Sequence, residues 1–256
     1  MDAGITGTTL VVLAVLFCVV AYLYSSIGLG GGSSYAALMV IFGVSTLAIP
    51  MVTLMLNICV TTVGSFNFIR NRHARLNLVW PFLVSSIPMA YLGGTLHLSP
   101  HIFYWILQIS LLLVAARIYL WRTTQLQLDM NPAGKIAISL VAGALLGLVA
   151  GIAGIGGGIY LIPLIILLGL GTEKEAAAAA AIFIWLNSVS GLASRLQYNA
   201  IDITEYLPLV IAVIIGGTLG SFMGSLKYSP AMMQKTLGIV ILIAIALLAR
   251  KVMLSG

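Results

Sequence analysis

The sequence has very few charged residues. Only 7% of its 256 residues are Asp, Glu, Lys or Arg, whereas 61% are hydrophobic, and the mean hydropathy is +1.14. A soluble domain of this size carries about 25% charged residues to cover its surface. The shortage excludes a soluble globular domain and indicates an all-α integral membrane protein that packs as a bundle in lipid.

Acidic residues are missing from the middle of every hydrophobic run. The six carboxylates lie in termini, loops or first helical turns: Asp2, Asp129, Glu173, Glu175, Asp202 and Glu205. The acidic proton relay of many pumps and antiporters therefore has no obvious member. Potential-driven export of an anion needs none, because a negative-inside potential favours its exit by about 2.3 kcal/mol per charge per 100 mV. Hydroxyls, backbone carbonyls or a protonated substrate are the other possible means of coupling ions.

Residues for metal or covalent chemistry are also scarce. Cys18 and Cys59, the two cysteines, fall in predicted spans, so we expect neither a disulfide nor a metal site from them. His97 and His101 are four residues apart, but Pro100 places them across a loop–helix junction. No activated nucleophile or pair of carboxylates is present. We therefore expect no metal, no cofactor and no enzyme activity.

Hydropathy and helix breakers predict ten segments. They cover about 7–27, 33–49, 52–69, 78–96, 100–121, 132–152, 159–171, 173–198, 204–224 and 230–250. The stretch Met1–Gly7 has no basic residue and precedes a run long enough to span, so it is not a cleavable signal. Asn131-Pro132 and Thr172-x-x-Glu175 are typical of helix starts, with a capping side chain before a proline and a capping box.

The basic residues lie in short loops and predict an orientation rather than a nucleic-acid surface. If all ten segments cross and the N-terminus is outside, nine fall inside: Arg70, Arg72, Arg75, Arg117, Arg122, Lys135, Lys174, Lys227 and Lys235. Three fall outside: Arg195, Arg250 and Lys251. This asymmetry favours an N-terminus outside.

The two halves of the chain repeat each other. "GLGGGSSYAALMVIFG" (28–43) aligns with "GIGGGIYLIPLIILLG" (154–169) at an offset of 126. At an offset of 130, Leu56-Asn57 pairs with Leu186-Asn187, and Ser99-Pro100 pairs with Ser229-Pro230. The sequence thus predicts two five-segment repeats, 1–125 and 126–256. Because five is odd, the second enters the membrane from the opposite side, as in the inverted repeats of many secondary transporters.

Small residues recur at every fourth position in three segments. These rows are 86/90/94, 216/220/224 and 143/147/151. Such rows let helices approach closely, and helix packing is the interpretation we favour for them.

A glycine-rich joint precedes a short apolar segment in each half. The segments 33–49 and 159–171 are short for a hydrocarbon core of about 30 Å. One interpretation is a hairpin whose tip enters the bilayer and presents free N–H groups and a helix N-terminus to an anion. The other is a tight turn at the membrane surface. Neither joint fits the G-x-G-x-x-G pattern of dinucleotide sites.

Polar residues near the joints extend the candidate site. Asn57 and Asn187 are equivalent in the two repeats, as are Asn67 and Gln197, although interhelical hydrogen bonds explain such residues equally well. Arg195 has no basic counterpart, because Ser65 occupies the equivalent position; it is either an anion-attracting charge or a side chain that snorkels to the membrane edge. The candidate substrate-binding residues are Gly30, Gly31, Gly32, Ser33, Ser34, Asn57, Gly156, Gly157, Gly158, Asn187, Arg195 and Gln197.

The glycine signatures "SSIGLGGGSSYAALMVIFG" and "AGIAGIGGGIYLIPLIILLG" resemble those of the TauE/SafE sulfite-exporter family, and the likeness runs through nearly the whole chain. The resemblance implies a permease for small sulfur-containing anions such as sulfite, sulfonates or sulfoacetate, acting outward across a bacterial inner membrane. One departure is that Pro163, after the second joint, has no counterpart after the first. The two joints are therefore not expected to be identical, and the first is the more polar.

From these observations we expect an exporter that works by alternating access, with a small anion and the lipid bilayer as partners and no nucleic acid. A homo-oligomer is possible. The alternatives are an anion channel and a membrane scaffold or accessory subunit that does not transport.

Overall fold

The computed structural model describes residues 7–96, 98–120, 131–198 and 203–226, together with positions 238, 241, 242, 245, 246 and 249. The described part of the chain is helical, without strands. Its elements are α1 (Gly7–Ser26), α2 (Gly32–Ile41), α3 (Ala48–Arg70), α4 (Leu76–Thr95), α5 (Pro100–Leu120), α6 (Pro132–Ala153), α7 (Gly158–Leu167), α8 (Glu173–Arg195), the 3-10 helix η1 (Ile203–Tyr206) and α9 (Leu207–Leu226). The predicted tenth segment, 230–250, lies largely outside the described residues.

Two of the predicted helix caps are present, at the starts of α6 and α8. The Asn131 side chain accepts a hydrogen bond of 2.7 Å from the N–H of Gly134 at the start of α6. At the start of α8, Thr172 and Glu175 form the predicted capping box, in which the Glu175 carboxylate accepts the Thr172 N–H at 2.8 Å. Local sequence therefore fixes where these two helices begin.

Helices α2 and α7 end earlier than the sequence predicts, at Ile41 rather than residue 49 and at Leu167 rather than residue 171. The cause is a glycine with positive φ two residues after each helix, Gly43 (φ 80°) and Gly169 (φ 61°). The residue after each glycine donates a hydrogen bond back into the last turn, which closes a Schellman motif. The prediction that these segments include the residues after the glycines is therefore wrong.

Six helical segments of the described chain are long and apolar enough to cross a membrane: Gly7–Ser26, Ala48–Arg70, Leu76–Thr95, Pro132–Ala153, Glu173–Arg195 and Thr204–Leu226. With ten residues each, α2 and α7 are about 15 Å long, half of a hydrocarbon core of about 30 Å. Neither of them can cross the bilayer alone. This is an integral membrane protein, but not every apolar segment of it is a complete span.

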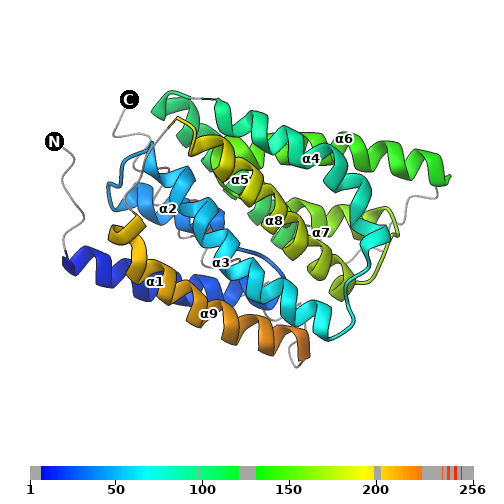
Figure 1. The fold of residues 1–256 in the computed structure, drawn as a ribbon, viewed down its shortest axis with the longest axis horizontal. Helices are drawn as coiled ribbons and strands as arrows, with labels where there is room; N and C mark the ends of the chain where they lie inside the picture. Colours follow the sequence, from blue (N-terminus) through cyan, green and yellow to red (C-terminus); the bar gives the residue numbers. More distant parts are fainter. Residues whose placement is uncertain are drawn as a thin grey trace.

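Two helix pairs lie on opposite sides of the molecule, with α3 and α8 between them (Figure 1). In Figure 1, α1 and α9 lie side by side along one side, and α4 and α6 lie along the other. Each pair joins helices that are far apart in the sequence. Buried side chains from both halves of the chain, including Phe17, Tyr35, Val52, Phe183 and Leu209, belong to one continuous hydrophobic core.

The rows of small residues bring the backbones of each helix pair into contact. A Cβ atom added to Gly143, Gly147 or Gly151 of α6 would collide with the carbonyl of Phe82, Ser86 or Ala90, respectively, in α4. A Cβ atom added to Gly216, Gly220 or Gly224 of α9 would likewise collide with the carbonyl of Cys18, Tyr22 or Ser26 in α1. Residue numbers rise together in both rows, so the helices of each pair run parallel. The predicted packing role of these rows is confirmed.

We expect Gly151→Ala and Gly220→Ala to destabilise the protein by roughly 1–3 kcal/mol each, because the added methyl group meets a backbone carbonyl that cannot move aside cheaply. The measurement is the temperature at which half of the detergent-purified protein is lost from the monodisperse peak in size-exclusion chromatography.

Gly64→Ala in α3 is the matched control. The nearest atom to its new Cβ is the Ser25 hydroxyl oxygen at 3.8 Å, so this variant should be as stable as the parent protein or more so, since alanine favours a helix. Equal stability of Gly151→Ala and Gly64→Ala would contradict the packing described for α4 and α6.

Candidate functional site

The first glycine joint connects α1 to α2 inside the bundle. Gly28 (φ 77°) ends α1, and Gly31 (φ 97°) is the residue before α2. A Cβ on Gly28 would meet the Ala177 carbonyl near the start of α8, and one on Gly30 would meet the Asn57 side chain in α3. Every residue from Ile27 to Gly31 is buried. A side chain at Gly28 or Gly30 would therefore push the joint away from α8 or α3.

The second joint connects α6 to α7 in the same manner. Gly154, Gly156 and Gly157 all have positive φ, between 71° and 80°. A Cβ on Gly154 would meet Thr53 and Pro50 of α3, and one on Gly156 would meet Ile184 of α8 at 2.7 Å. This joint is also buried and also passes between α3 and α8.

The two joints meet near the middle of α3 and α8. A Cβ on Gly32 would lie 2.6 Å from Asn57 Nδ2 and 2.9 Å from the carbonyl oxygen of Gly154, in the second joint. Asn57 is the tenth of 23 residues in α3, and Ile184 is the twelfth of 23 in α8. Both helices are long enough to span, so the joints are interior breaks. Burial of both joints within the bundle favours the re-entrant interpretation over a tight turn at the membrane surface.

The N-terminal ends of α2 and α7 both lie at this meeting point. The N–H groups of Gly32, Ser33, Gly158 and Ile159 donate to no acceptor among the described residues, as is usual for the first turn of a helix. Each such end carries a partial positive charge from the helix dipole. The site thus presents two positive helix ends to the same point in the bundle.

Asn57 is the side chain that contacts both joints. It is fully buried, and its Nδ2 donates to the Gly154 carbonyl at 3.3 Å. Its Oδ1 has no hydrogen-bond partner among the described residues. An unpaired buried amide oxygen costs free energy, and rotation of the amide group would turn its NH₂ donors toward a ligand instead.

Asn187, the predicted equivalent of Asn57, is also fully buried but bonds within its own helix, to the Phe183 carbonyl at 2.8 Å. Its Oδ1 has no partner within the described chain, nor does the hydroxyl of neighbouring Ser188. In α8 it is Ile184, and not Asn187, that lies against Gly156 of the second joint. Helices α3 and α8 therefore contribute unequally to the site.

Ser33 and Ser34 have a partner that the sequence did not suggest. The Tyr24 hydroxyl lies 3.1 Å from the Ser33 hydroxyl oxygen and 2.8 Å from that of Ser34, and all three residues are buried. These bonds connect the last turn of α1 to the first turn of α2. Tyr24 and Ile184 carried no sequence signal, because both resemble ordinary apolar helix residues until the chain is folded.

Arg195, the last residue of α8, is only 5% exposed. Its Nη2 donates to the carbonyls of Gly151 at 2.9 Å and Ile152 at 2.7 Å, and its Nε donates to Gly151 at 3.3 Å. These carbonyls belong to the last turn of α6, where a helix carries a partial negative charge. A buried guanidinium is not a side chain that snorkels to an exposed edge, so that interpretation is wrong.

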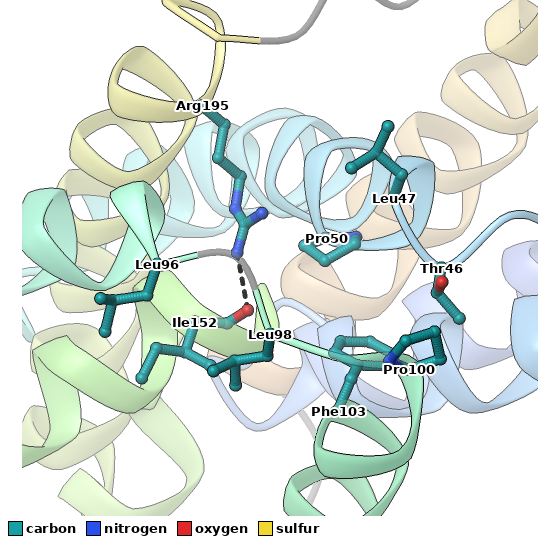
Figure 2. Close-up of a pocket in the computed structure, with 9 residues that line it drawn as sticks. All are labelled: Thr46, Leu47, Pro50, Leu96, Leu98, Pro100, Phe103, Ile152 and Arg195. Carbon is teal, nitrogen blue, oxygen red and sulfur yellow. Dashed lines mark hydrogen bonds between the residues drawn. The ribbon is translucent and has the colours of Figure 1, made fainter.

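Arg195 also lines a pocket of about 220 Å³ (Figure 2). Figure 2 shows its guanidinium group between Ile152 and Pro50. The remaining lining residues are Thr46, Leu47, Leu96, Leu98, Pro100 and Phe103. The pocket lies where α3 and α5 begin and where α4, α6 and α8 end.

Two other predicted features lie away from the joints. Gln197 is exposed in the turn after α8, where its Nε2 donates to the Tyr91 hydroxyl at 2.7 Å. His101 accepts a hydrogen bond of 3.0 Å from the Trp105 indole, and His97 lies outside the described residues. The fold therefore brings together the two joints and Asn57, and places Arg195 at one end of the bundle and Gln197 beyond the end of α8.

Comparison with known proteins identifies the family of the chain. The family model "Sulfite exporter TauE/SafE" matches residues 12–252. The chain is 31% identical over 238 residues to probable membrane transporter protein y4hK of Sinorhizobium fredii, covering 91% of this chain and 95% of that protein. It is 24% identical to probable membrane transporter protein YjnA of Bacillus subtilis, covering 85% and 91% respectively. No solved structure matches.

The paired glycine joints occur in a chain that matches this family along nearly its full length, and the similar proteins are described as membrane transporters. The chain therefore belongs to the TauE/SafE sulfite-exporter family of membrane transporters.

Proposed function

We propose that this protein exports small sulfur-containing anions, such as sulfite, sulfonates or sulfoacetate, across a bacterial inner membrane by alternating access. The observation that supports it most directly is the meeting of two helix N-termini at Asn57, deep in an apolar bundle. Buried N–H groups at helix N-termini favour anions, and interrupted helices of this kind form the substrate sites of several transporter folds. The substrate class comes from the family.

The anion would bind between the two joints. Backbone N–H groups of Gly30–Ser33 and Gly156–Gly158 would donate to its oxygens, and Asn57 would orient it. No carboxylate lies near the middle of α3 or α8, and such a group would repel an anion. In the conformation described, Ile184 packs against Gly30 and Gly156.

We further propose a 5+5 inverted repeat of residues 1–125 and 126–256 as the basis of alternating access. Exchange of the two halves converts the parallel pair α1 and α9 into the parallel pair α6 and α4, and converts α3 into α8. Each pair contains one helix from either half, in backbone contact along its length. The units that rock would therefore be these two pairs, moving about α3 and α8, rather than the two halves of the sequence.

The end where α3 stops and where α4 and α8 begin would face the cytoplasm. Arg70, Arg72, Arg75 and Lys174 lie at this end, where Arg75 forms an ion pair of 3.2 Å with Glu175. This charge distribution follows the positive-inside rule and supports the proposal that α1 starts outside. Arg195 then lies toward the outer face, at the exit of an exported anion.

We expect purified protein in proteoliposomes to move radiolabelled sulfite with saturable kinetics that respond to an imposed membrane potential. A potential that is positive on the destination side should increase the flux, because a moving anion gains about 2.3 kcal/mol per charge per 100 mV. Liposomes without protein give the background. Flux that rises linearly with concentration would favour an anion channel, and absence of flux from folded protein would favour a scaffold.

Asn57→Asp should abolish this flux while the protein stays folded. The change keeps the shape of the side chain but places a negative charge between the two helix N-termini, where it occupies the position proposed for the anion. Flux of radiolabelled sulfite, measured at equal amounts of reconstituted protein, should fall by at least about tenfold.

Asn131→Asp is the matched control, because aspartate caps a helix as well as asparagine does and this position is exposed at the start of α6. Its flux should equal that of the parent protein. If the Asn57→Asp variant moved sulfite as fast as the parent protein, the assignment of the anion site to the joints would be wrong.

A further inference from the structure

Within the described part of the chain, the buried cation Arg195 has no carboxylate partner. The ion pair found among the described residues joins Arg75 to Glu175, at the opposite end of the bundle. The negative charge near Arg195 is that of the α6 C-terminus, equivalent to about half an elementary charge. Arg195 is only 5% exposed. The helix end therefore compensates only part of its positive charge, and the rest is left without a negative partner within the described residues.

The remaining donor capacity of this guanidinium faces the pocket. Nε and Nη2 are used by the α6 carbonyls, whereas Nη1 donates to no acceptor within the described part of the chain. Arg195 is a lining residue of the pocket, and Figure 2 shows the head of its side chain directed into it. An anion in the pocket would supply both the missing charge and the missing acceptor.

The other side chains that line the pocket are mostly apolar. They belong to Leu47, Pro50, Leu96, Leu98, Pro100, Phe103 and Ile152, and Thr46 is the one polar side chain besides Arg195. Side chains of this kind supply few of the donors needed to replace the hydration of an inorganic dianion. They also lack a carboxylate to pair with an ammonium group. The wall matches instead a ligand that has one anionic head and an apolar tail.

The pocket is also in contact with the joints. Pro50 lines the pocket, and a Cβ on Gly154 would lie 2.8 Å from its Cα. Ile152 lines the pocket two residues before Gly154, whose carbonyl accepts from Asn57. The pocket and the second joint are therefore neighbours, with Pro50 and Ile152 lying between them.

We propose that the Arg195 pocket binds small alkanesulfonate-type monoanions at this end of the bundle, and that it selects them over inorganic dianions and over zwitterions such as taurine. The proposal rests on the proposed function and adds to it a second anion site, which favours the alkanesulfonates within that substrate class. A volume of about 220 Å³ is below the roughly 300–1,000 Å³ of clefts for drug-sized ligands, so the tail is limited to a few carbons.

Binding to detergent-purified, full-length protein tests the proposal without requiring transport. The probes are sodium methanesulfonate, ethanesulfonate and 1-propanesulfonate, with sulfate and taurine as comparators, in isothermal titration calorimetry at constant ionic strength. Each added methylene should tighten binding by about fourfold, from the ordinary gain for a buried CH₂ group. Propanesulfonate should bind at least about tenfold more tightly than sulfate or taurine.

The variant Leu98→Asp tests whether propanesulfonate binds in this pocket. Leu98 is a partly exposed loop residue between α4 and α5, so its replacement leaves intact the bonds from Arg195 to α6, which Arg195→Gln would break. A carboxylate at this position should weaken propanesulfonate binding by at least about tenfold. Leu98→Asn is the control of equal size without charge, and it should bind within about threefold of the parent protein.

Equal affinity for sulfate and propanesulfonate, or equal affinity of Leu98→Asp and Leu98→Asn, would overturn the pocket assignment. If either result were obtained and the parent protein still moved sulfite in proteoliposomes, the proposed function would stand without the pocket assignment. The predicted chain-length preference in the absence of any flux would instead support the pocket as an anion site and overturn the proposed function.

Discussion

A helix can be interrupted inside a membrane only where protein, rather than lipid, surrounds its free backbone groups, because hydrocarbon offers them no hydrogen bonds. The rest of this structure depends on that constraint. The joints before α2 and α7 are surrounded by α3 and α8, whose middle residues Asn57 and Ile184 contact them directly. Glycine is required there because a side chain at Gly28, Gly30 or Gly32 would collide with its neighbours. The same absence of side chains leaves N–H groups free to face the interior.

The outer helix pairs provide the rigid surroundings that these breaks need. Where Gly147 faces Ser86 and Gly220 faces Tyr22, the backbones of neighbouring helices touch, so each pair offers little freedom to separate. The weaker connections lie elsewhere. Ser33 and Ser34 hold the first joint through a single tyrosine hydroxyl, and α3 contacts α9 through side-chain hydrogen bonds such as that of Asn67 with Ser221. A structure with two rigid pairs around a break-containing centre is well suited to discrete conformational change.

Electrostatics gives the two ends of the bundle different characters. Basic residues on solvent-accessible loops gather at the end that includes the ion pair of Arg75 with Glu175, where water screens them. At the other end, Arg195 is buried and relies on the C-terminus of α6 for partial compensation. A charge held in this way costs desolvation free energy that packing alone does not return. The pocket beside Arg195 is where an anion would offset that cost.

The sequence by itself determined the membrane class, the caps of α6 and α8, the packing rows of small residues and the family, because composition, local capping chemistry and spacing are properties of neighbouring residues in the chain. It also indicated the two glycine joints, but not whether they lie at the surface or inside. Tertiary structure decided that question, since their depth depends on what packs around them. It likewise decided that Asn57 contacts both joints while Asn187 bonds to its own helix, that Tyr24 holds the serines, and that Arg195 is buried beside α6. Those facts depend on how the fold packs whole segments together, as where Asn57 reaches Gly154, 97 positions away, and Arg195 reaches Gly151, 44 positions away, and no local pattern encodes that packing.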